Sequence, residues 1–259
     1  MMSTDWKEYV ERLKKAVSLT KAPIAIQAVA HKDDLDAIQK LRRPKHLHMP
    51  CQLLGQAMQM GFTIGFTDDD LVGDNCSRTV GLLEQTDEWR KGEIFNGVWC
   101  GSLQDAELHH GALTPTDRRR YGALVASPLA SGRITPDVCM LVGSPGQIFM
   151  VISGYLRQKF EPLTQRFVGE SSCSMGWVKT LQTGEPGLAV PCFAEMRYGG
   201  FSEHEMILTL SPEDFVRSVE GLEALGKVGL RYPVPPYGMQ MDVCEGVGVS
   251  YGDALKKGL

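Results

Sequence analysis

Apolar and polar positions near the N-terminus change from a helical to a strand pattern. An amphipathic helix is predicted where apolar residues recur every three or four positions: Trp6, Tyr9, Val10, Leu13 and Val17. Pro23 ends this segment, and the apolar run at 24–29 is typical of a buried strand. The polar segment 32–41 that follows is predicted to form a second helix.

Start and stop signals define three longer helices. Pro50 suits the first turn of a helix, and Gly61 follows the last apolar position of the same segment. The pair at 144–145, Ser-Pro, supplies a cap and a first-turn proline for a helix to about Gln158. Ser-Pro at 211–212 repeats this signal, with acidic residues beside the positive helix end.

The middle of the chain is less regular. Asp74 and Asn75 are expected to cap a helix that carries the apolar residues of segment 80–83. Residues 86–120 contain many turn formers and charges with little periodicity, so this stretch is predicted to be mainly irregular. His109 and His110 have no cysteine or acidic partner at ligand spacing, and we expect them at the surface.

Short apolar runs between the helices predict the remaining strands, at 62–66, 121–125, 138–142, 188–190 and 206–210. Strands and helices are interspersed without a repeat or a long linker. The sequence therefore predicts one α/β or α+β domain over residues 1–238 and a C-terminal tail over 239–259. The order of the strands does not follow from these patterns.

Composition narrows the function classes. The chain has 259 residues, 43% hydrophobic and 22% charged, which is typical of a globular protein. The formal charge of −4 and a pI near 5.9 come without a long basic run, so nucleic acid is not an expected partner. The N-terminus lacks a signal-peptide pattern, and the uncharged stretch 138–156 contains a Gly-Ser-Pro-Gly turn. A cytoplasmic protein without a membrane anchor is predicted.

Seven cysteines are the unusual feature of this composition. Cys51 and Cys76 stand at predicted helix starts, Cys173 follows two serines that are expected to cap a third such segment, and Cys192 follows a proline at a strand end. Unpaired N–H groups and the positive dipole at a helix start lower the pKa of a cysteine and favour the thiolate. Cys139 lies in an apolar strand and is predicted to be a packed thiol.

Four thiolates from several chain segments are the usual ligand set of an iron–sulfur cluster and of structural zinc. None of the intervals among the four cysteines is the short C-x2-C spacing of common metal motifs. Spacing alone therefore favours inert buried thiols over a metal site.

Several short motifs add a family resemblance. They are Cys-Gln-Leu-Leu at 51–54, Asn-Cys at 75–76, Pro-Asp-Val at 136–138, Ser-Pro-Gly-Gln at 144–147, Pro-Cys-Phe-Ala-Glu-Met-Arg at 191–197, Glu-Met-Ile at 205–207 and Ser-Pro at 211–212. In order and spacing, over about residues 6–235, they resemble the domain of unknown function 169 family, a group of prokaryotic, largely anaerobe-associated proteins.

The resemblance implies a ligand set. The recurring cysteines of that family match Cys51, Cys76, Cys173 and Cys192, and Cys100, Cys139 and Cys244 are left out. The segment after the Pro-Cys pair usually resembles Gly-Asp-Arg in the family, whereas here it is Ala-Glu-Met-Arg and only the arginine is kept.

Together these observations lead to one main expectation, an iron–sulfur protein of anaerobic metabolism with a [4Fe–4S] cluster on the four cysteines. Its role would be redox or lyase-type, with a small-molecule substrate or a redox partner protein. Gln147 at a helix start, Arg197 after the Cys192 loop and Arg78 near Cys76 are the candidate substrate-binding residues. A homo-oligomer stays open.

Two alternatives use the same cysteines differently. In one, a cysteine is a nucleophile, and the best local pair is Cys51 with His48. In the other, the cysteines hold zinc in a non-catalytic assembly subunit, and the Pro-rich segment 232–237 docks a partner. Zinc is thus the second metal to consider.

Overall fold

A seven-stranded sheet forms the centre of the molecule, in the order β2-β3-β4-β1-β5-β7-β6. The computed structural model describes residues 4–117, 121–234 and 239. All neighbouring strands are antiparallel except the pair β2 and β3. The strands are β1 (Ile24–Val29), β2 (Leu41–Arg42), β3 (Thr63–Phe66), β4 (Ala123–Pro128), β5 (Val138–Gly143), β6 (Gly187–Ala189) and β7 (Met206–Leu210).

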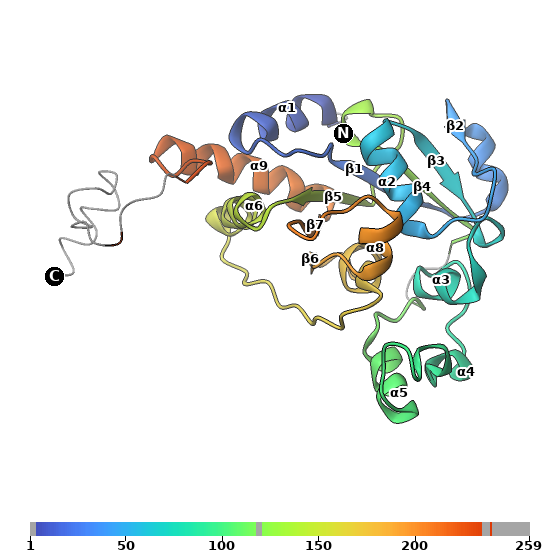
Figure 1. Ribbon diagram of the computed structural model, residues 1–259. Helices are drawn as coiled ribbons and strands as arrows, with labels where there is room; N and C mark the ends of the chain where they lie inside the picture. The colour runs from blue at the N-terminus through green and yellow to red at the C-terminus, as the bar shows by residue number, and fades with distance from the viewer. Residues whose placement is uncertain (1–3, 118–120, 235–238, 240–259) are drawn as a thin grey trace.

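Helices cover both faces of the sheet (Figure 1). The helices are α1 (Trp6–Ala16), α2 (Pro50–Met60), α3 (Gly73–Thr79), α4 (Asp87–Arg90), α5 (Leu103–Ala112), α6 (Pro145–Gln158), α7 (Lys179–Thr183), α8 (Phe193–Tyr198) and α9 (Pro212–Lys227). Short 3-10 helices are η1 (Lys32–Ala37), η2 (Asp68–Asp70), η3 (Glu93–Phe95) and η4 (Leu129–Ser131), and η5 (Ser174–Val178) is a π-helical turn. The protein is a single α/β domain.

The central strands β1, β4, β5 and β7 contribute to two cores because alternate side chains point to opposite faces. Ile24 and Ile26 of β1 pack with α2, η5 and α7, whereas Ala25 between them packs with α1, α6 and α9. On β5, Cys139 belongs to the second core and is fully buried, which confirms the predicted packed thiol. Burial on both faces explains why β5 is an unbroken apolar run.

Helices with two independent end signals lie where they are predicted. Ser144 Oγ accepts the N–H of Gln147 at the start of α6, and Ser211 Oγ accepts the N–H of Asp214 at the start of α9. Gly61 ends α2 with φ 71°, in the left-handed region that glycine adopts easily. The N-terminal helix and the strands at 24–29 and 206–210 are confirmed as α1, β1 and β7.

Other boundaries differ from the prediction. Segment 32–41 forms the 3-10 helix η1 and the short strand β2 instead of one helix. The helix expected after Asp74 ends at Thr79, so the apolar residues at 80–83 lie beyond it. The strand expected at 121–125 runs from Ala123 to Pro128, because its pairing with β1 and β3 sets its limits.

Segment 86–120 was expected to be irregular and contains a ten-residue helix, α5. Ser102 caps this helix by accepting the N–H of Asp105. The periodicity is weak because only Ala106 and His110 are buried along it. The surface prediction is also wrong for His110, whose buried ring lies 4.7 Å from Trp89 and 4.8 Å from Phe95. His109 is half-buried, and burial lowers the pKa of both imidazoles.

The uncharged stretch 138–156 forms β5, the Ser144 cap and most of α6, as predicted. Within the described residues, no helix combines the length and the apolar character needed to cross a membrane. The predicted tail at 239–259 lies outside the described residues except for Met239, and so do Cys244 within it and residues 118–120.

Helices α6 and α9 approach each other through two glycines. A Cβ atom on Gly221 would lie 1.9 Å from the carbonyl oxygen of Gly154, and one on Gly154 would lie 2.4 Å from that of Ser218. We expect Gly221→Ala to lower the free energy of unfolding by about 3 kcal/mol, because the two backbones must separate. Gly226→Ala, in the same helix with nothing within 4 Å of the added methyl, should leave stability unchanged or raise it by up to about 1 kcal/mol. Urea denaturation of both variants checks this contrast, and equal stabilities would contradict it.

Candidate functional site

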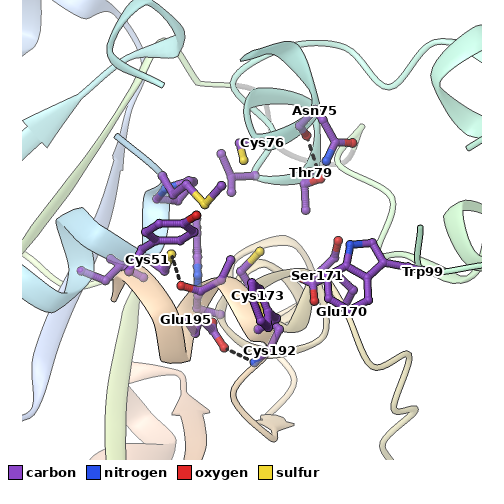
Figure 2. Close-up of a pocket in the computed structure, with 18 of the residues that line it drawn as sticks. Cys51, Asn75, Cys76, Thr79, Trp99, Glu170, Ser171, Cys173, Cys192 and Glu195 are labelled. Atoms are coloured by element: carbon purple, nitrogen blue, oxygen red, sulfur yellow. Dashed lines mark hydrogen bonds between the residues drawn. The ribbon is translucent and has the colours of Figure 1, made fainter. Parts of the chain in front are cut away.

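Four cysteines that are far apart in the sequence line one cavity of about 270 Å³. Cys51 is the second residue of α2, Cys76 lies in α3, Cys173 immediately precedes η5, and Cys192 caps α8. In Figure 2 the sulfur atoms of Cys51, Cys76 and Cys173 face a common space, and Cys192 lies beside Glu195. Cys51 and Cys192 are buried, whereas Cys76 and Cys173 are partly exposed.

Close packing of α2 on α8 brings Cys51 against the segment that follows Cys192. The Cys51 thiol donates a hydrogen bond to the carbonyl oxygen of Ala194, at 3.5 Å. A Cβ atom on Gly55 would lie 2.3 Å from the carbonyl oxygen of Gly199, so glycine at position 55 permits this approach. The start of α2 is held by the Gln52 side chain, which accepts the N–H of Met49 at 2.9 Å.

Glu195 joins the segments that carry Cys173 and Cys192. Its carboxylate accepts the backbone N–H of Cys192 at 2.9 Å and the hydroxyl of Ser172 at 2.5 Å. The sequence predicts that Ser172 helps to cap the segment of Cys173. It does not, because its hydroxyl is bonded to Glu195. Ser171 has φ 61°, a left-handed conformation that is uncommon outside glycine, and it also lines the cavity.

Burial shifts the pKa of the four thiols in the direction opposite to the one that the predicted helix starts suggest. It raises the pKa of Cys76 to about 11 and that of Cys192 to about 12, and it also raises the pKa of Cys51 and Cys173 well above the ordinary value. The helix starts were expected to lower these values, but the desolvation of a thiolate outweighs the helix dipole. The negative charge of Glu195 adds to the shift at Cys51, Cys173 and Cys192. In the metal-free protein at neutral pH the thiols are therefore protonated.

Glu195 itself is the residue that sequence reasoning missed. Its side chain is only 2% exposed, and burial raises its pKa to about 7 from the ordinary 4.5. A signal was present, because an acidic residue three positions after Cys192 fits the first turn of a helix that begins there. The helix is only six residues long and carries no apolar stripe, so it was not predicted.

Aromatic and aliphatic side chains form most of the rest of the cavity wall, among them Leu54, Val80, Phe95, Trp99 and Trp177. Asn75 contributes from α3, and its side-chain oxygen accepts the indole N–H of Trp89 at 2.8 Å, which ties α4 to α3. An apolar wall around thiols restricts access of water to the site.

The three predicted substrate-binding residues do not line this cavity. Gln147 is buried at the start of α6, where its amide accepts the N–H of Ser144 and donates to the carbonyl of Ser18. Arg78 pairs with Asp74 at 3.2 Å and bonds the carbonyl of Glu84. Arg197 is exposed on α8, with its guanidinium 5.9 Å from the Phe193 ring and 5.7 Å from the Tyr198 ring.

His48 and the remaining described cysteines also lie outside the cavity wall. The His48 ring interacts with the carbonyl of His46 at 2.6 Å. Cys100 is partly exposed after η3, and Cys139 is in the opposite core. Across the described ranges, no three His, Cys, Asp or Glu side chains are grouped so closely that they could hold a metal ion as they stand. The four cysteines line one cavity, but their side chains are not arranged as a closed ligand set.

Comparison with known proteins identifies a family. A family model described as DUF169, Uncharacterised ArCR, matches residues 12–221. No curated protein and no solved structure matches the chain significantly.

Proposed function

The chain belongs to the domain of unknown function 169 family, and from this premise we propose that Cys51, Cys76, Cys173 and Cys192 bind an iron–sulfur cluster, most simply [4Fe–4S]. The observation that carries the proposal is that these four cysteines, which are far apart in the sequence, all line one cavity. Soft thiolate ligands favour iron–sulfur clusters and zinc over hard cations.

The cavity and its wall fit such a group. The four thiols reach the cavity from four separate segments, and its volume of about 270 Å³ leaves room for a centre larger than a single ion. When bound, a cluster held by four thiolates supplies one-electron transfer, and one held by three supplies a Lewis-acidic iron. The apolar wall limits solvent access, which also tunes such a centre.

Binding of the cluster is controlled by protonation of the protein's own side chains. Each ligating thiol must lose its proton when metal binds, and burial holds the pKa of Cys76 near 11 and of Cys192 near 12. Glu195, bonded to the Cys192 backbone, holds Cys192 at the cavity and keeps a carboxyl group with a pKa of about 7 beside it. We therefore propose that loading becomes more favourable as pH rises.

For the role of the site, we propose redox or lyase-type chemistry on a small molecule, or electron exchange with a partner protein, in the cytoplasm of an anaerobic cell. The nucleophile alternative has less support, because His48 does not line the cavity and burial keeps the Cys51 thiol protonated. Zinc remains the competing metal, since the same thiolates are its usual ligands.

Native mass spectrometry of protein purified without oxygen separates the two metals. A [4Fe–4S] cluster adds about 350 Da to the metal-free mass, whereas one zinc ion adds about 65 Da. We expect the larger increment, and we expect it to disappear after treatment with a chelator and an oxidant. The zinc increment in protein reconstituted with iron and sulfide would contradict the proposal.

A further inference from the structure

A second concave site lies against the cysteine cavity. This groove has a volume of about 620 Å³, within the usual range for small-molecule sites. It shares Trp99, Glu170, Cys192 and Phe193 with the cavity, so the two sites have a common wall. Figure 2 shows Trp99 and Glu170 side by side at the edge of the cavity.

Exposed aromatic rings line this groove. The rings of Trp99 and Phe193 have their centroids 5.7 Å apart, and the two residues are 49% and 47% exposed. Phe167, in the segment before Cys173, is 58% exposed and lines the same groove. Met175 and Met196 add thioethers, which contact aromatic rings favourably. Large exposed rings around a concave surface are typical of a site for a flat apolar group.

One cation lies in the same groove. Arg166 belongs to the groove wall, and its guanidinium forms no ion pair with any carboxylate in the part of the chain that the structure describes. A guanidinium binds phosphate or carboxylate groups bidentately. The carboxylate of Glu170 lies on the wall shared with the cavity, so an anionic group is favoured at Arg166 and disfavoured beside Glu170.

We propose that this groove binds a planar aromatic ring that carries an anionic group, with the ring against Trp99 and Phe193 and the anion on Arg166. Flavin mononucleotide is a ligand of this class. The binding claim does not depend on the cluster, and a ring in the groove would be separated from the cysteine cavity only by the shared wall.

Titration of the full chain into flavin mononucleotide, followed by quenching of flavin fluorescence, tests the proposal. We expect saturable binding in the micromolar range, on the order of 10 μM. Riboflavin has the same ring without the phosphate and should bind about fivefold more weakly. Arg166→Gln should abolish that difference, whereas Arg157→Gln, an exposed arginine of α6 outside the groove, should preserve it.

Trp99→Leu removes the ring contact at a half-exposed position where folding should tolerate the change. It should weaken the binding of both flavins at least about fivefold, as base stacking on aromatic residues does elsewhere. Absence of quenching up to about 1 mM, equal affinity for the two flavins, or binding that is insensitive to Trp99→Leu would overturn the proposal. Each titration is run with and without bound iron, so that failure of the groove proposal can be told apart from failure of the cluster proposal.

Discussion

Single replacement of Cys51, Cys76, Cys173 or Cys192 by alanine is expected to remove most of the iron that protein purified without oxygen retains. Each thiol reaches the cavity from its own segment, so no neighbouring cysteine takes its place. An iron that loses its thiolate is open to solvent and the cluster degrades. We expect each variant to hold less than about half of the wild-type iron per folded chain, measured by iron analysis alongside circular dichroism.

The chain offers two matched controls for this experiment. Cys139 is fully buried in the core on the other face of the sheet, and Cys100 is partly exposed after η3. Cys100→Ala and Cys139→Ala should keep the wild-type iron content. Unchanged iron in all four cavity variants would contradict the ligand assignment, whereas iron loss in three of the four would identify the open position of a cluster with three ligands.

The metal-free protein is expected to lose stability between about pH 4.5 and pH 7 through Glu195. Burial raises the pKa of this carboxyl group to about 7 from 4.5, so in this interval the folded state holds a proton that the unfolded state has lost. Stability from this group is therefore fully present below pH 4.5 and declines as pH rises to about 7. The shift corresponds to about 3 kcal/mol in the free energy of unfolding.

Glu195→Gln isolates this contribution. The amide retains acceptor capacity for the Cys192 N–H and the Ser172 hydroxyl, but it cannot ionise. Chemical denaturation of both metal-free proteins under reducing conditions, at pH 4.5 and pH 7.5, should show the wild type losing about 3 kcal/mol more than the variant. The imidazoles of His109 and His110 are present in both proteins, so their titration cancels. Parallel pH profiles would contradict the assignment.

Local signals predicted those elements that are held by local contacts. Ser211 and Pro212 mark the start of α9 because the cap bond to Asp214 spans three residues. The sequence pattern does not predict helix α5, because the helix carries no apolar stripe and packs against aromatic rings from other segments of the chain. The order of the seven strands depends on pairings such as that between β5 and β7, which no local pattern specifies.

The candidate site shows the same difference between what local sequence signals predict and what long-range packing determines. Short motifs and helix starts singled out the four cysteines, but their burial, and with it the rise in pKa, depends on tertiary packing. The position of Gln147 at a helix start predicts a substrate-binding residue. Its amide instead donates to the carbonyl of Ser18, which is 129 positions away in the sequence. The pairing of Arg78 with Asp74, one helical turn earlier, could have been predicted from sequence.

The most direct test of the central claim is an absorption spectrum, with iron and sulfide analysis, of protein purified and kept without oxygen. We predict a broad band at about 400 nm that bleaches with dithionite or air, and about four irons and four sulfides per chain. A spectrum without this band, and no bound iron or sulfide after reconstitution, would contradict the assignment of Cys51, Cys76, Cys173 and Cys192 as cluster ligands.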